Sequence, residues 1–229
     1  MGEHQRAAVP ARPGSDRARF GEAPLAQTVA AAGAVRRLSS LLLSLEHTHP
    51  TVDAMIAQIA AWESELSSAV PPDSTPRIGD DDGDRRVYLD HATDIGAFNP
   101  CFPEYHFDRI DGETASGHVV FPLVYEGPPG LVHGGFLAVF FDCVMQHQNC
   151  VTGLSGKTRS LQVTFRRPTP VLTELRFDIS RSEVERGIAS TARLLLDDEV
   201  LCIGEVTTLA LPPEKLTGHR FGKRRTETS

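Results

Sequence analysis

The stretch 131–151 limits the folds open to this chain more than any other part of the sequence. It is apolar, contains no proline and carries glycine only near its start, at Gly134 and Gly135. Such a run is too long for a strand and has the length of a buried helix. After residue 86, every other segment with a clear pattern looks like a strand. The sequence therefore predicts an α+β domain in which an antiparallel sheet wraps one long helix.

Six strand-like segments surround this helix, two before it and four after it. The first two are joined by Asp111-Gly112, a common hairpin turn, and the later ones are divided by prolines, glycines and aspartates. Short turns between consecutive strands predict an antiparallel meander. The six segments are 105–110, 116–125, 160–167, 174–181, 188–196 and 201–211.

The N-terminal third has a different organisation. Apolar residues recur at helical spacing in 24–46 and again in 51–69, with a break at Pro50. These two helices predict an antiparallel hairpin that packs on something else, because so small a unit buries little surface. The expected units are a flexible tail (1–22), a helical hairpin (23–70), an acidic Pro/Gly linker (71–85), the main domain (86–212) and a flexible C-terminal tail (213–229).

Charge and composition exclude several classes of protein. The net charge is −7 and the pI is near 5.7, which argues against a protein that binds nucleic acid through a basic surface. No apolar run reaches the roughly 18 residues of a membrane span. The charged start has no signal-peptide pattern, and the four cysteines are too few and too uneven for a disulfide scaffold. We expect a cytoplasmic protein whose thiols are reduced and mostly buried.

The segment just before the central helix has the composition of a shaped loop. Two prolines and several glycines surround His133, and Gly134 and Gly135 stand where the helix begins. Backbone N–H groups are unpaired at a helix N-terminus, which also carries about half a unit of positive charge. Such an end binds an anion or polarises a carbonyl group. An ordinary tight turn into a helix is the alternative.

Asp142 is the one carboxylate inside the apolar helix. An isolated charge there is costly unless it is paired or functional. It follows His133 by nine residues, which places it half a turn away and about 13 Å along the axis. One helix cannot aim both groups at one small substrate, whereas two antiparallel copies related by a two-fold axis can. The spacing favours a dimer with two shared sites; a structural bond to Asp142 is the alternative.

These residues also carry a family resemblance, which covers about 95–212. The loop Gly-Pro-Pro-Gly-Leu-Val-His-Gly-Gly, the carboxylate nine residues after its His, and Thr158 before the turn Arg166-Arg167-Pro-Thr-Pro resemble hotdog-fold acyl-CoA thioesterases. The phenylacetyl-CoA thioesterase-like branch is the most similar. Some members carry Asn six residues before the His, where this sequence has Gly127. The resemblance implies a hotdog fold and hydrolysis of acyl-CoA to free acid and coenzyme A.

The resemblance also implies residue roles in a site shared by two chains. The amide of Gly134 or Gly135 would polarise the thioester carbonyl, and His133 would shape that turn. From the other chain, Asp142 would act as general base or as nucleophile, and Thr158 would position the water. No metal or other cofactor is expected, because coenzyme A belongs to the substrate. Four cations are candidates for its phosphates or, alternatively, plain surface charges: Lys157, Arg159, Arg166 and Arg167.

Several alternatives remain open at this point. The domain could bind acyl-CoA or lipid without catalysis while the hairpin recruits a partner, or it could hydrate or dehydrate enoyl thioesters. Cys143, His147 and Cys150 share a helix face and could in principle hold zinc, although no fourth ligand is evident. Cys143 is a weaker candidate nucleophile. Acyl preference, dimer or dimer of dimers, and the role of the hairpin are not determined by the sequence.

Overall fold

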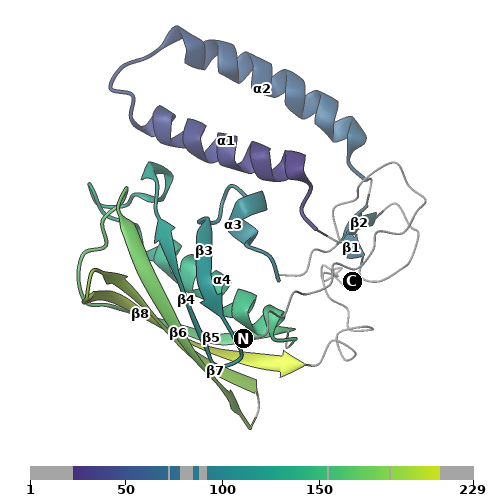
Figure 1. The fold of residues 1–229 in the computed structure, drawn as a ribbon. Coiled ribbons are helices and arrows are strands. Elements are labelled where there is room, and N and C mark those ends of the chain that lie inside the picture. Colours follow the sequence, from purple (N-terminus) through teal and green to yellow (C-terminus); the bar gives the residue numbers. More distant parts are fainter. Residues whose placement is uncertain are drawn as a thin grey trace, which may run out of the picture.

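A computed structural model describes residues 23–71, 73–77, 85–87, 92–153, 155–185 and 187–211. One six-stranded antiparallel sheet curves around the long helix α4 (Gly134–Val151), as Figure 1 shows. The strand order is β3-β4-β6-β7-β8-β5. The strands are β3 (Tyr105–Ile110), β4 (Thr114–Val120), β5 (Ser155–Phe165), β6 (Glu174–Val184), β7 (Gly187–Leu196) and β8 (Glu199–Leu211). The predicted helix wrapped by an antiparallel sheet is confirmed.

The sheet is not the simple meander that the sequence suggested. After β4 the chain passes through the short 3-10 helix η1 (Leu123–Tyr125) and α4, and β5 then joins the opposite edge, beside β8. The expected strand 116–125 stops at Val120, since Pro122 cannot donate to a strand ladder. Four strand spacings, about 19 Å, separate β4 from β5. The 18 residues of α4 are long enough to cross that width.

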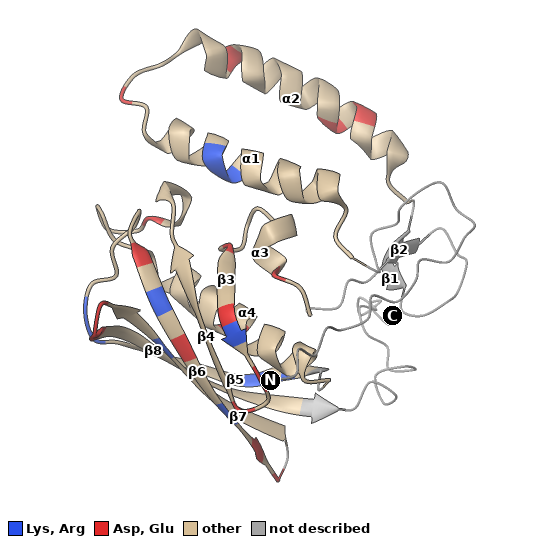
Figure 2. Ribbon diagram, in the orientation of Figure 1, with Lys and Arg blue, Asp and Glu red and all other residues tan. Residues whose placement is uncertain are grey.

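The core lies between α4 and the concave face of the sheet. Phe140, Phe141 and Val144 of the helix are fully buried against the inward residues of the strands. Gly204 of β8 lies directly against the helix, because a Cβ atom there would clash with the ring of Phe141. The opposite face of the sheet is polar, and Figure 2 shows acidic and basic residues alternating along β6. Burial on one face only explains the alternating pattern of the strands.

Local sequence signals define several boundaries. The turn predicted at Asp111-Gly112 is confirmed, because Asp111 Oδ1 accepts from the backbone N–H groups of Glu113 (3.0 Å) and Thr114 (2.8 Å). Those bonds and Arg109 hold the pKa of the Asp111 carboxyl well below its usual range. Asp94 caps the short helix α3 (Ile95–Phe98) in the same way, accepting from the N–H of Gly96 at 2.8 Å.

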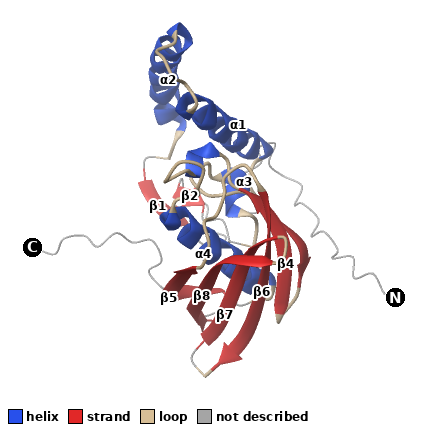
Figure 3. Ribbon diagram, turned by 90° about the vertical axis from the view of Figure 1, so that its left-hand side faces the viewer, coloured by secondary structure: helices blue, strands red, loops and turns tan. Residues whose placement is uncertain are grey.

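The predicted N-terminal hairpin is present and sits at one end of the domain (Figure 3). It consists of α1 (Ala26–Leu43) and α2 (Pro50–Ala69). Helix α1 packs against α3 and η1, whereas α2 contains no buried residue. The buried Arg36 fastens α1 to the domain by donating to the carbonyl oxygens of Gly96 and Asn99 and by pairing with Glu104 at 2.8 Å.

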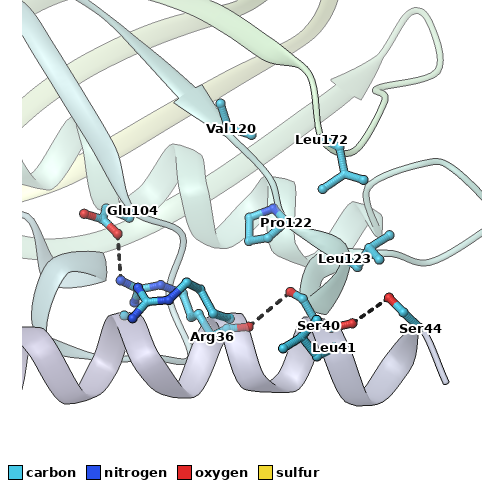
Figure 4. A pocket seen from close by; sticks show the side chains of 11 residues that line it. Arg36, Ser40, Leu41, Ser44, Glu104, Val120, Pro122, Leu123 and Leu172 are labelled. Carbon is cyan, nitrogen blue, oxygen red and sulfur yellow. Dashed lines mark hydrogen bonds and ion pairs between the residues drawn. The ribbon is translucent and has the colours of Figure 1, made fainter.

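A groove of about 560 Å³ runs between α1 and the ends of the neighbouring strands. In Figure 4 its walls are formed by α1 on one side and by Val120, Pro122, Leu123 and Leu172 on the other. None of the predicted catalytic residues lines it. The groove therefore belongs to the junction of hairpin and domain.

Two short strands pair in parallel near the predicted linker: β1 (Asp73–Arg77) lies within it, and β2 (Arg85–Val87) spans its boundary with the main domain. The acidic run within that linker and the two predicted tails lie outside the described residues. Among the helices that are described, none has both the length and the apolar character needed to cross a bilayer.

Candidate active site

The Gly-Pro loop before α4 is fixed by backbone hydrogen bonds on both sides. Val132 donates to Thr169 O at 2.8 Å, and Val171 donates to Gly130 O at 3.0 Å. His133 donates to Tyr125 O at 2.9 Å. A Cβ atom at Gly127 would come within 2.9 Å of His133, and the absence of a side chain there lets the imidazole close over the loop. The loop is therefore a rigid support for the start of the helix.

His133 is the N-cap of α4. Its Nδ1 atom accepts a hydrogen bond from the N–H of Gly135 at 3.0 Å. A neutral imidazole that accepts at Nδ1 carries its proton at Nε2, which makes the outer edge of the ring a donor. The amide of Gly135 is thus already engaged, whereas the N–H of Gly134 has no hydrogen-bond partner among the described residues. Of the two predicted amide donors, Gly134 is the one that remains available to a ligand.

Asp142 and Thr158 meet directly, as their predicted common role requires. The Thr158 hydroxyl donates to Asp142 Oδ1 at 2.5 Å, and this contact is open to solvent. Asp142 itself is half-buried on α4, in an otherwise apolar run of the helix. The carboxylate therefore has a structural partner and solvent access together.

A β-bulge in β5 brings Thr158 to Asp142. The register of β5 against β8 shifts between Thr158 and Ser160, which leaves Arg159 as the extra residue. Leu161 and Val163 point toward the helix, and unbroken alternation would turn Arg159 inward and Thr158 outward. The extra residue reverses this and places Thr158 opposite Thr208. The bulge thus selects which side chain of β5 reaches Asp142.

Sequence reasoning missed a set of polar residues behind this pair. The side-chain amide of Gln146 donates to Thr158 Oγ1 and to Thr208 Oγ1, both at 2.9 Å. Gln146 and Asn149 are buried on α4, and Arg181 of β6 is buried beneath them. The available signal was the presence of amide side chains in a helix that otherwise consists of apolar residues.

The four candidate phosphate-binding cations are exposed and lie along β5 and just after it. Arg167 is paired with Glu199 at 2.7 Å, an exposed ion pair that competes only weakly with a ligand. Within the described residues, neither Arg159 nor Arg166 forms a side-chain ion pair. Lys157 and Arg159 flank Thr158 in sequence. The cations are therefore near the Asp142–Thr158 pair along the strand, and their role stays a prediction.

The alternative readings of the helix cysteines find little support. His147 Nδ1 lies 3.1 Å from the hydroxyl of Tyr105, and the part of the chain that the structure describes contains no group of three residues able to hold a metal. Burial raises the pKa of the Cys143 thiol, which opposes formation of a thiolate nucleophile.

The four cysteines are unpaired, as expected, but the prediction that they are mostly buried is wrong. Cys202 is buried, and burial raises the pKa of its thiol to about 11. Cys143 and Cys150 are half-buried, and Cys101 is exposed in the turn after α3. The sequence of the apolar helix did not show that Cys143 and Cys150 lie on a part of its surface that the sheet covers only partly.

Comparison with known proteins bears on the fold. No protein-family model matches this sequence, and no curated protein matches it. A solved structure of a thioesterase superfamily protein matches with a TM-score of 0.65 and 22% identity, over 81% of this chain and 96% of the other.

Two further structures are more distant. A phenylacetic acid degradation-related protein from Ralstonia eutropha JMP134 has 21% identity over 47% of this chain and 84% of its own, with a TM-score of 0.42. A hypothetical thioesterase protein from Streptococcus pneumoniae TIGR4, solved with coenzyme A, has 14% identity over 48% of this chain and 90% of its own, with a TM-score of 0.45. The strand order, the wrapped helix and the match with a TM-score of 0.65 together identify the architecture: this chain has the hotdog fold.

Proposed function

We propose that this protein hydrolyses acyl-CoA thioesters to a free acid and coenzyme A. The observation that carries the proposal is the solvent-accessible hydrogen bond from Thr158 to Asp142 on the central helix. The N–H of Gly134 at the head of the same helix supports it, because this group has no partner within the described part of the chain. A carboxylate for water and a polarised amide for the carbonyl are the two groups that thioester hydrolysis requires.

The proposed site combines the two groups from different protomers. Asp142 lies about 12 Å along the helix from Gly134, which is too far for both to contact one carbonyl group. In an antiparallel pair of helices, the Gly134 end of one would face the Asp142 region of the other. The functional unit is therefore a homodimer with two sites, and dimers could pair further.

The hydrogen-bond pattern gives Asp142 and Thr158 separate tasks. Thr158 uses its proton on Asp142 and one lone pair on Gln146, which leaves a second lone pair for a water proton. Asp142 keeps its other oxygen for the second water proton. A water held in this way is oriented toward a carbonyl carbon bound beside it, and Asp142 acts on it as general base.

The reaction proceeds by addition and elimination. Asp142 takes a proton from the water while the water oxygen forms a bond to the carbonyl carbon. The carbonyl oxygen becomes an oxyanion that accepts from the Gly134 N–H and from His133 Nε2–H of the partner. The C–S bond then breaks, coenzyme A leaves as a thiolate, and the proton on Asp142 returns to that thiolate or to solvent. Arg159 and Arg166 bind the phosphates of the nucleotide.

The test is hydrolysis of a panel of acyl-CoA thioesters, aliphatic chains of graded length and phenylacetyl-CoA, followed by thiol release. Asp142→Ala should lower kcat by about 100-fold or more. Asp178→Ala is the matched control, since Asp178 is a half-exposed carboxylate paired with Arg193 at 2.7 Å on the outer face of the sheet. Unchanged hydrolysis by Asp142→Ala would show that the assigned base is wrong.

A non-catalytic role in binding acyl-CoA or lipid is the second candidate. It is favoured by helix α2, which exposes Ile59, Trp62 and Leu66 in a stripe suited to a partner. Binding of the esters by the wild-type protein, measured by calorimetry, without hydrolysis of any member of the panel would establish that role instead.

A further inference from the structure

A continuous polar network leads from Asp142 into the interior of the domain. Thr158 donates to Asp142 at 2.5 Å, and Gln146 donates to Thr158 at 2.9 Å. Asn149 Nδ2 donates to Gln146 Oε1 at 3.4 Å, and Arg181 Nε donates to Asn149 Oδ1 at 2.8 Å. These five residues, together called the Asp142 network, join the candidate base to a buried guanidinium group on β6.

The two ends of the network fix the direction of every bond in it. A guanidinium group can only donate and an ionised carboxylate can only accept. Asn149 must therefore turn its oxygen to Arg181 and its NH₂ group to Gln146. Gln146 in turn presents its NH₂ group to Thr158, whose proton is left for Asp142. All donors point from Arg181 toward Asp142, and reversing any amide would set two donors or two acceptors against each other.

Burying the polar side chains of the network costs folding free energy, which calls for a compensating role. Asn149 is completely buried, and Gln146 and Arg181 are each 8% exposed. The nearest carboxylate that forms an ion pair with Arg181 is the exposed Glu183, at 3.7 Å. A buried cation and two buried amides stabilise a fold less than apolar side chains of the same size would. The Arg181 guanidinium also donates to the carbonyl oxygen of Gly112 at 2.8 Å, which supports the fold. The arrangement of Arg181 and the two amides in one line that ends on Asp142 supplies a further reason for their presence.

Gln148 shows what a purely structural amide looks like on the same helix. It is completely buried two residues after Gln146, and its Nε2 atom donates to the carbonyl oxygen of Asp111 at 3.0 Å. That bond ties α4 to the β3–β4 turn, and no side chain of the Asp142 network takes part in it. Gln148 therefore supports the fold, whereas Gln146 contacts the Thr158 hydroxyl of the candidate site.

We propose that Gln146, Asn149 and Arg181 are positioning residues for the thioester hydrolysis proposed above, on which this inference rests. Gln146 holds the Thr158 oxygen so that its proton points at Asp142 and its free lone pair points at the water. Asn149 and Arg181 hold Gln146 in the orientation that permits this. The network fixes the direction of the Thr158 hydroxyl, and none of the three residues touches the substrate.

The decisive comparison is Gln146→Met against Gln148→Met, because both replace a buried amide on α4 with an apolar side chain of similar shape. Gln146→Met should lower kcat between about 10- and 100-fold with KM within about twofold of wild type, since a supporting partner is lost while binding is not. Gln148→Met should lower the melting temperature and leave kcat within about twofold. Equal kcat values for the two variants would overturn the proposal.

Asn149→Leu provides a second, independent variant, and carries the test if Gln146→Met does not fold. It leaves the bonds of Gln146 to Thr158 and Thr208 possible but removes the link to Arg181. We expect kcat to fall in the same direction. The double variant Gln146→Met/Asn149→Leu should be no slower than Gln146→Met alone, because both act on one hydroxyl. Multiplication of the two losses would contradict a single network.

A crystallographic readout distinguishes failure of this inference from failure of the proposed function. In Gln146→Met the Thr158 hydroxyl should turn away from Asp142, lengthening the 2.5 Å contact beyond hydrogen-bond range. In Gln148→Met the contact should persist. If the wild-type protein hydrolyses no thioester yet these structures differ as stated, positioning of Thr158 stands and the reaction assignment falls. An unchanged contact in Gln146→Met overturns the positioning role whatever the activity.

Discussion

Thr158 reaches Asp142 only because β5 contains one extra residue beside it. Strand alternation carried back from Val163 and Leu161 would face Arg159 toward the helix, yet the register shift against β8 turns Thr158 inward instead. Bulges next to functional sites commonly redirect one side chain in this way. The pairing of a hydroxyl with the helix carboxylate is thus a product of strand register.

The Thr158 hydroxyl should be required for turnover, while its methyl group should not. Thr158→Ser keeps the hydroxyl and should retain kcat within about threefold, whereas Thr158→Val removes a bond to a charged group and should lower kcat about 10- to 100-fold. Thr164→Val is the control, because Thr164 is exposed on the same strand away from the helix. Wild-type kcat in Thr158→Val would exclude a role for this hydroxyl.

A site shared by two protomers should permit complementation between inactive subunits. Gly134→Pro removes the available N–H without breaking α4, since proline is tolerated at the first helical position and His133 is already extended at ψ 132°. Mixed with Asp142→Ala subunits, it forms heterodimers with one intact site. Isolated heterodimers should recover about half of the wild-type activity, because one of their two sites is intact.

The subunits would be tagged differently and purified through both tags, and hydrolysis would then be measured for each species. Homodimers of either variant serve as the controls and should remain inactive. Heterodimers as inactive as these parents would place each site within one chain.

Arg36 should contribute to stability through the attachment of the hairpin. Arg36→Met leaves the carbonyl oxygens of Gly96 and Asn99 without their donor, which we expect to lower the free energy of unfolding by about 1–3 kcal/mol. Arg37→Met, one residue on and exposed, should change it by no more than about 0.5 kcal/mol. Urea unfolding measures both. Equal midpoints for the two variants would refute a tether at Arg36.

Asp94 should make the protein less stable as the pH rises through the weakly acidic range. Burial raises the pKa of Asp94 from 3.8 to about 6, even though its oxygens accept from the N–H groups of Gly96 and Tyr105. Between these values the folded state holds a proton that the unfolded state has released. The contribution of protonated Asp94 to the free energy of unfolding is fully present below pH 4 and is lost as the pH rises through 6. The shift in pKa limits this contribution to about 3 kcal/mol.

Asp94→Asn cannot ionise and should flatten this part of the stability curve relative to wild type. Asn is also an acceptable N-cap, which keeps the start of α3 in place. Urea midpoints between pH 4 and pH 7.5 measure the difference between the two proteins. Parallel curves would show that Asp94 does not titrate with a raised pKa.

Much of the domain followed from sequence pattern. The length and apolarity of 131–151 predicted α4, and the Asp111-Gly112 turn between two alternating segments predicted the β3–β4 hairpin. Strand order was not predictable in the same way. The pairing of β5 with β8 depends on the direction in which α4 crosses the sheet, and the local sequence pattern does not determine that direction.

The candidate site was predicted as a set of residue types but not as an arrangement. His133, Gly134 and Asp142 could be named because each is chemically unusual in its context, and Thr158 could be named only through the resemblance to acyl-CoA thioesterases. Which amide stays available could not be predicted, because it depends on the imidazole of His133 accepting from Gly135. The support given by Gln146, Asn149 and Arg181 could not be predicted either. Its bond from Arg181 to Asn149 joins residues 32 positions apart in the sequence, and it exists only after the sheet has closed over the helix.

The sequence by itself determined the elements of this protein, because helix and strand periodicity, turn residues and the single carboxylate in an apolar helix are local properties of the chain. The tertiary structure alone decided which side chains meet. The one-residue bulge in β5 moves the side chains that precede it to the opposite face of the sheet. The cost of burying the Arg181 guanidinium is offset only by groups that folding brings beside it, such as Asn149.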